Sequence, residues 1–117
     1  MGVDEIRQIC LSLPASEECF PFNETTLVFK VAGKMFLLID IDSPNQVTIK
    51  AAPEIALELR EQFDWVLPGY HMSQKHWITL ELEKANSHFL VKDWILNSYG
   101  LVYKGLTQKK RAEIEGR

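Results

Sequence analysis

Two β-rich runs separated by a glycine-containing turn constrain this chain more than any other feature. Residues 25–31 and 35–42 are dominated by β-branched and large apolar side chains, and Ala32, Gly33 and Lys34 lie between them. This pattern predicts a β-hairpin, which makes the two strands antiparallel neighbours. A doubly wound parallel sheet is therefore excluded, because its consecutive strands are joined by helical crossovers.

Other periodic segments predict helices around this hairpin and further strands after it. The expected helices cover 3–13, 53–63 and 87–99, and the further strands cover 46–51 and 76–82. Asn86 is the expected cap and Gly100 the expected stop of the third helix, and Thr107 is expected to cap a short terminal helix. The predicted fold class is α+β, with one antiparallel sheet covered by helices.

The length of the chain indicates a single domain. It has 117 residues, of which 46% are hydrophobic, and at this size roughly two thirds of the surface of the unfolded chain becomes buried on folding. We assign the domain to residues 1–113. Residues 114–117 read Ile-Glu-Gly-Arg, a protease site common in expression vectors, and receive no functional weight.

Alternation along the strands divides their side chains between two faces of the sheet. One face is expected to be covered by helices and collects Leu27, Phe29, Val31, Leu37, Ile39, Ile41, Val47, Ile49, Ile78, Leu80 and Leu82. The other face is mixed and carries Lys30, Lys50 and Trp77 together with Val28, Phe36 and Leu38. Either Trp77 is exposed among lysines and stacks a nucleobase, or these apolar residues form a second small core under a loop or the terminal helix.

Charge and cysteine content limit the partners and the compartment. The formal net charge is -3, so an anionic partner must meet a local basic patch. Cys10 and Cys19 form no CxxC pair, and the chain shows no secretory leader, which favours a reducing cytoplasm. The longest apolar runs are too short to cross a bilayer, so no membrane partner is expected.

Sequence motifs for catalysis are missing. The chain has no GxSxG elbow, P-loop or GxGxxG, so we expect no enzyme activity and no cofactor. His71, His76 and His88 match no metal-ligand spacing, and no metal site is predicted. One alternative remains, in which an acidic surface captures iron weakly through Asp4, Glu5, Glu17 and Glu18.

Lysines near the predicted hairpin point to nucleic acid. The candidate contacts are Lys30, Lys34, Lys50, Lys75, His76 and Trp77, supplemented by the cluster Lys109, Lys110 and Arg111. A protruding hairpin with basic residues beside its turn is a wing that can lie along a groove of double-stranded DNA, and binding by three or four such contacts is weak. As an alternative, a cleft around Tyr70, His71, His76 and Trp77 holds a small ligand or a protein segment. No long exposed apolar stripe requires a dimer, so a monomer is expected.

An ordered set of short segments resembles the MmcQ/YjbR family. The segments are Cys10 to Pro14 followed by Glu17 and Glu18, Phe29 to Phe36, Lys50 to Glu54, and Lys75 to Trp77, and the resemblance spans about residues 3–111. It implies a CyaY-like α-β-α arrangement, a bacterial cytoplasmic protein and DNA binding through two wings. Carried over to this chain, the wings are the hairpin around Gly33 and the loop before Lys75. His76 and Trp77 belong to the family motif.

Overall fold

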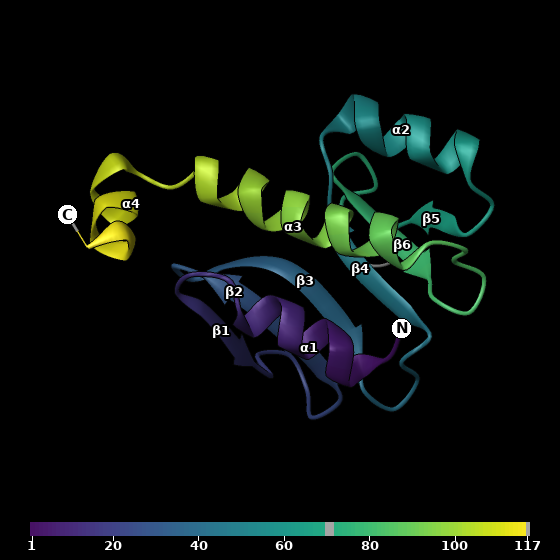
Figure 1. The fold of residues 1–117 in the computed structure, drawn as a ribbon, viewed down its shortest axis with the longest axis horizontal. Helices are drawn as coiled ribbons and strands as arrows, with labels where there is room; N and C mark the ends of the chain where they lie inside the picture. Colours follow the sequence, from purple (N-terminus) through teal and green to yellow (C-terminus); the bar gives the residue numbers. More distant parts are fainter. Residues whose placement is uncertain (70–71, 117) are drawn as a thin grey trace.

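The structure is a computed structural model that describes residues 1–69 and 72–116. The described residues form a six-stranded sheet and four helices (Figure 1). The helices are α1 (Val3–Leu11), α2 (Pro53–Gln62), α3 (His88–Lys104) and α4 (Gln108–Glu115). The strands are β1 (Ser16–Cys19), β2 (Thr26–Val31), β3 (Lys34–Asp40), β4 (Gln46–Lys50), β5 (Val66–Pro68) and β6 (Trp77–Glu81).

Every neighbouring pair of strands is antiparallel, in the order β1-β2-β3-β4-β6-β5. The first four strands follow one another as a meander, whereas α2 and the edge strand β5 are inserted before β6 returns to pair with β4. The α+β class and the central hairpin predicted from the sequence are confirmed.

The hairpin turn is tighter than predicted. Val31 pairs with Lys34, so Ala32 and Gly33 alone form the turn, with φ angles of 50° and 79°. Two consecutive positive φ angles match a type I′ turn, whose twist suits the flanking strands. Gly33 adopts this conformation freely, but the Cβ atom of Ala32 makes it unfavourable by about 1 to 2 kcal/mol.

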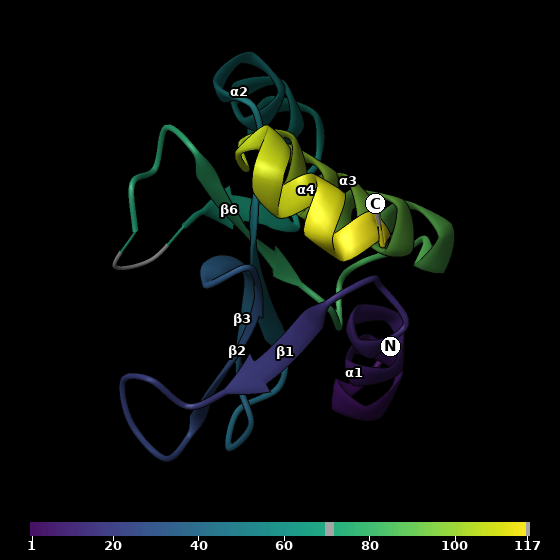
Figure 2. The ribbon, with the colours of Figure 1, turned by 90° about the vertical axis from the view of Figure 1, so that its left-hand side faces the viewer.

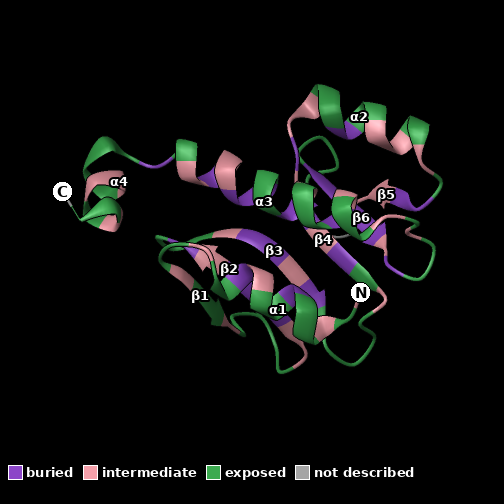
Figure 3. Ribbon diagram, in the orientation of Figure 1, coloured by how far each residue is buried: buried purple, intermediate pink, exposed green. Residues whose placement is uncertain are grey.

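Helices cover only one face of the sheet. Figure 2 shows α1 and α3 on one side of the strands, and the segments 20–25 and 72–76 projecting from the other. Helix α2 packs against β5 and β6 at the edge of the sheet, and α4 follows α3 at one end of the molecule (Figure 1). Buried residues concentrate on the strands and on the sheet-facing side of α3, whereas α4 buries none (Figure 3). We call the sheet face opposite α1 and α3 the open face.

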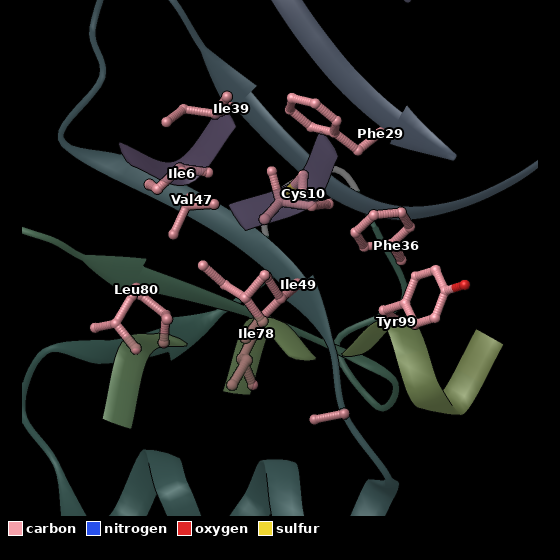
Figure 4. Close-up of a cluster of buried hydrophobic side chains, with 14 of the residues drawn as sticks. Ile6, Cys10, Phe29, Phe36, Ile39, Val47, Ile49, Ile78, Leu80 and Tyr99 are labelled. Atoms are coloured by element: carbon pink, nitrogen blue, oxygen red, sulfur yellow. The ribbon is translucent and has the colours of Figure 1, made fainter. Parts of the chain in front are cut away.

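The main core lies between the sheet and the helices α1 and α3. Ile6 and Cys10 from α1 are fully buried against the strands (Figure 4). Ile95 from α3 is also fully buried in this core. The predicted helix-covered residues are buried, as expected, at Leu27, Phe29, Val31, Leu37, Ile39, Val47, Ile49, Ile78, Leu80 and Leu82. Ile41 was predicted wrongly: it is exposed, because β3 ends one residue earlier.

A β-bulge moves Phe36 to the face opposite the predicted one. Phe29 pairs with Leu37 but Lys30 pairs with Met35, so Phe36 is the extra residue. A bulge interrupts the alternation of side chains, and here Phe36 and Leu37 both enter the main core. The Phe36 ring meets the Tyr99 ring of α3 edge to face, with centroids 5.3 Å apart (Figure 4).

The two predicted ends of the third helix were wrong, and two short strands were not predicted. Helix α3 begins one residue later than its predicted cap implies, because the hydroxyl of Ser87 accepts the hydrogen bond from the Leu90 N–H. It also continues through Gly100, since the burial of Val102 outweighs the cost of one helical glycine. The short strands β1 and β5 were expected to be loops, and their three or four residues carry too little alternation to be recognised. The Thr107 cap of α4 is confirmed.

Candidate functional site

The predicted basic residues of the hairpin share one end of the sheet. That end carries the β2–β3 turn, the last residue of β4 and the first residue of β6, and we call it the hairpin end. Lys30 and Lys50 lie on the open face, because the residues before them, Phe29 and Ile49, are buried in the core. This part of the face assignment is confirmed. Their strands are two apart, a spacing of about 10 Å.

Lys34 lies beside the same turn but toward the helix-covered side. It pairs with Val31, and paired residues point to the same face. Val31 is buried in the main core, whereas Lys34 at the end of the strand is exposed. Lys30 and Lys34 therefore flank the turn on opposite faces of the sheet, so the three lysines do not form one flat patch.

The segment before β6 extends this region toward α2. Lys75 is exposed and lines a shallow hollow with Glu54 and Arg60 of α2. His76 is also exposed, and its backbone carbonyl accepts a hydrogen bond from the Ala51 N–H directly after β4. Lys75 and His76 thus border the hairpin end from its α2 side.

Trp77 is not the exposed platform that one interpretation required. It pairs with Lys50 on the open face as predicted, but only 8% of its surface is accessible. Gly69 continues the pairing of β5 with β6: its N–H donates to the Trp77 carbonyl at 3.1 Å, and a Cβ atom on Gly69 would lie 2.6 Å from the Trp77 Cβ. Val28 is also fully buried, whereas Phe36 lies in the main core and Leu38 is half-buried. The prediction of an open indole is therefore wrong, and the four residues predicted to form a second small core do not gather in one cluster.

The alternative ligand cleft involves residues outside the description. Tyr70 and His71 belong to the undescribed part of the chain, so their half of the predicted cleft is untested. The other half is His76, which is exposed, and Trp77, which is buried. An indole in this position offers no open wall to a ligand.

Carboxylates gather at the end of the sheet opposite the hairpin end. Asp40 ends β3 and Glu81 ends β6, and the acidic first turn of α1 contains Asp4 and Glu5. Within residues 1–69 and 72–116, no three Asp, Glu, His or Cys side chains are grouped to hold a metal ion. The acidic iron site is therefore not formed by the described residues.

One carboxylate of the proposed iron surface is already engaged. Glu18 accepts two hydrogen bonds from the Arg7 guanidinium, at 2.6 and 2.7 Å, which lowers the pKa of Glu18 and ties α1 to β1. Glu17 lies on the other side of the strand, as the Cα partner of Lys30. It therefore weakens the positive potential next to Lys30.

The two cysteines are both free thiols. Cys10 faces the core as predicted, and burial raises the pKa of its thiol to about 12, so it is not a thiolate nucleophile at neutral pH. Cys19 is partly buried in β1 rather than in the predicted loop.

An unpredicted cavity of about 470 Å³ opens on the other half of the open face. Phe22, Asn23 and Met72 flank it, and the strands β2, β3 and β4 provide its floor. Its lining includes Phe22, Thr26, Asp40, Thr48 and Met72. The sequence signal was the pair of aromatic residues in Phe-Pro-Phe-Asn (20–23), which no strand or helix pattern uses.

Comparison with known proteins places the chain in a family. The YjbR family model matches residues 11–101. The chain belongs to the YjbR family. Among curated relatives, YbdF of Escherichia coli O157:H7 is 32% identical over 109 residues, covering 92% of this chain and 89% of YbdF. YjbR of Escherichia coli K12 is 26% identical over 112 residues, covering 95% of each chain.

Solved structures give the same result for the fold of this YjbR-family chain. The crystal structure of Deinococcus radiodurans DR2400, with its DUF419 domain, has a TM-score of 0.91 and 39% identity, covering 97% of this chain and 87% of DR2400. A protein from Pseudomonas syringae has a TM-score of 0.71 at 22% identity, over 86% of this chain and 98% of that protein. The names of these four proteins state no activity. No described helix is long and apolar enough to span a membrane.

Proposed function

We propose that the chain is a monomeric, cytoplasmic binding protein without enzymatic activity that binds double-stranded DNA weakly through the hairpin end. The candidate contacts are Lys30, Lys34 and Lys50, bordered by Lys75 and His76. Trp77 has no stacking role in this proposal, because it is buried. The two-wing and CyaY-like descriptions of the family remain predictions that motivate the choice of partner.

The observation that carries the proposal is the environment of these lysines. In the described part of the chain, ion pairs within 4 Å involve Arg7, Lys84 and Lys110, and none involves Lys30, Lys34 or Lys50. The turn between the first two offers small side chains, Ala32 and Gly33, both exposed. A backbone with such small side chains can approach a phosphate closely, while the ammonium groups beside it provide the charge.

Helix α4 adds cations at the same end of the molecule. Figure 1 shows α4 and the β2–β3 turn toward the same end of the longest axis. This helix carries Lys109, Lys110 and Arg111 in its first half, although Lys110 is within 3.8 Å of Glu113. Asp40 and Glu81 lie at the opposite end of the sheet, so this end favours a polyanion despite the net charge of -3 and the carboxylate of Glu17 beside Lys30.

The test is a salt-dependent titration of a short fluorescent duplex, followed by anisotropy. At about 50 mM salt we expect a dissociation constant between about 1 µM and 0.1 mM. If three phosphates are neutralised, the affinity falls about 40-fold between about 50 and 200 mM salt. Absence of binding at the lower salt concentration would reject the proposal.

Two double variants with the same change in net charge locate the site. Lys30→Gln/Lys50→Gln should weaken binding and flatten its salt dependence, because two phosphate contacts are lost. Lys84→Gln/Lys92→Gln alters the other end of the molecule and should leave binding nearly unchanged. Equal losses from the two double variants would show that binding is not located at the hairpin end.

A third variant tests the sign of the local charge. Glu17 is the cross-strand partner of Lys30, so Glu17→Gln should strengthen binding and leave the fold intact. Weaker binding by this variant would contradict the assignment of Lys30 as a phosphate contact.

A further inference from the structure

We propose that the cavity on the open face binds a small organic cation, a molecule with a protonated amine and an aromatic or aliphatic body. The cavity volume of about 470 Å³ is within the range of pockets that hold small ligands. It lies toward the acidic end of the sheet, away from Lys30 and Lys50, so its function is independent of DNA binding.

Apolar walls and hydrogen-bonding groups face each other across this cavity. Phe22, Leu38 and Met72 provide apolar surface, and Thr26, Gln46 and Thr48 provide hydroxyl and amide groups. This combination lets the body of a ligand be desolvated while a few polar contacts determine its orientation.

The charge of the lining selects a cation. Asp40 is the one ionisable side chain among the described residues that line the cavity. Its Oδ1 atom accepts a hydrogen bond of 2.9 Å from the Asp42 N–H, which holds the carboxylate at the rim. A negative group beside an aromatic ring attracts an amine by its charge and by cation–π contact, and it repels a carboxylate.

The cavity is held open without a ligand by hydrogen bonds around it. The Asn23 side chain accepts hydrogen bonds from the N–H groups of Thr25 and Thr26, at 2.9 and 2.7 Å, and so braces the loop that carries Phe22. On the floor, the hydroxyl groups of Thr48 and Thr79 lie 2.9 Å apart. Because the walls are braced before binding, little ordering cost opposes the ligand.

Phe22 is the clearest sign that something covers this surface. It is 61% exposed on a braced loop, although the removal of a large aromatic side chain from water is favourable. A ligand lying on its inner side removes part of that surface from water. Phe20, in the same loop, is 47% exposed but does not line the cavity, which makes it a matched control.

The experiment uses three probes of similar shape and different charge. Phenethylamine, phenethyl alcohol and phenylacetate are titrated separately into ¹⁵N-labelled protein, and amide chemical shifts are followed by NMR. We expect the amine to shift the amides of Thr26, Asp40 and Thr48 most, the alcohol to bind about threefold to fivefold more weakly, and the acid to bind least. Equal shifts from amine and acid, or no shifts at these amides, would overturn the proposal.

Two pairs of variants then assign the contacts. Asp40→Asn keeps the hydrogen-bonding shape and should abolish the preference for the amine over the alcohol, whereas Asp42→Asn makes the same change in net charge outside the cavity and should keep it. Phe22→Ala should weaken the binding of phenethylamine about threefold or more, and Phe20→Ala should not. If both members of either pair behave alike, this cavity is not the binding site.

Discussion

The two faces of the sheet differ in how their side chains are buried. On the face covered by α1 and α3, strand residues pack against helices and are almost completely removed from water. On the open face, burial is local: Trp77 is buried next to Gly69, while Leu38 and Thr48 remain half-buried beside a cavity. The difference teaches that the helix-covered face stabilises this fold, whereas the open face keeps accessible surface that a ligand can contact.

Leu37 and Leu38 compare the two faces directly, because they are adjacent residues of the same type on β3. Leu37 is fully buried in the main core, so Leu37→Ala should lower the free energy of unfolding by about 3 to 5 kcal/mol. Leu38→Ala should cost about 1 kcal/mol, since its side chain lies at the open cavity. Chemical denaturation of both variants measures the difference. Equal losses would mean that the open face is as tightly packed as the covered one.

Ser98 is the point where a helix reaches into the sheet. Its buried hydroxyl accepts from the Lys50 N–H at 2.8 Å and donates to the Phe36 carbonyl at 2.6 Å, bridging β3 and β4 beyond their last paired residues. Ser98→Ala leaves both backbone groups without this partner and should lower the free energy of unfolding by about 2 to 3 kcal/mol. Urea unfolding measures this, with the exposed Ser73→Ala as a control that should be neutral. A loss no larger than that of Ser73→Ala would show that the Ser98 bridge does not stabilise the fold.

Gly69 tests whether the open face is sealed around Trp77 by close backbone contact. A Cβ atom there would meet both the side chain and the backbone of Trp77, so Gly69→Ala should cost about 1 to 3 kcal/mol and shift the indole N–H resonance of Trp77. Gly100→Ala in α3 meets nothing within 4 Å and should instead stabilise the protein by about 0.5 to 1 kcal/mol. NMR spectra and thermal unfolding report both effects. An unchanged Trp77 resonance in Gly69→Ala would contradict the close contact.

The smallest effect is expected at the edge, where Arg7 pairs with Glu18. The pKa of Glu18 is lowered in the folded state, so the pair stabilises the fold above the usual Glu pKa of 4.5, and this contribution is lost as the pH falls through the lowered value. Glu18→Gln should remove that acidic-range pH dependence and cause only a minor, salt-sensitive loss at neutral pH, because the pair is exposed. Unfolding of this variant and of Glu17→Gln, measured from pH 7 to pH 3, checks it. An identical pH profile in the two variants would show that the pair contributes nothing.

Local patterns in the sequence were sufficient to predict the helices and strands whose apolar residues recur at regular spacing. The hairpin, the helices and the covered face could be predicted because period-two and period-3.6 spacing directly reflect burial on one side. The candidate lysines on β2 and β4 were also placed on the correct face, for the same reason. Short edge strands gave no such signal, and one bulge at Phe36 was enough to move an aromatic ring to the other side of the sheet.

The amino-acid sequence by itself determined the antiparallel α+β fold, the Cys10 core position and the basic residues beside the hairpin turn, because each depends on spacing along the chain. Only the tertiary structure decided which open-face residues meet water. The cavity brings Met72 to the strands that carry Thr26 and Asp40, more than 30 residues earlier in the chain, and no local pattern encodes such a contact.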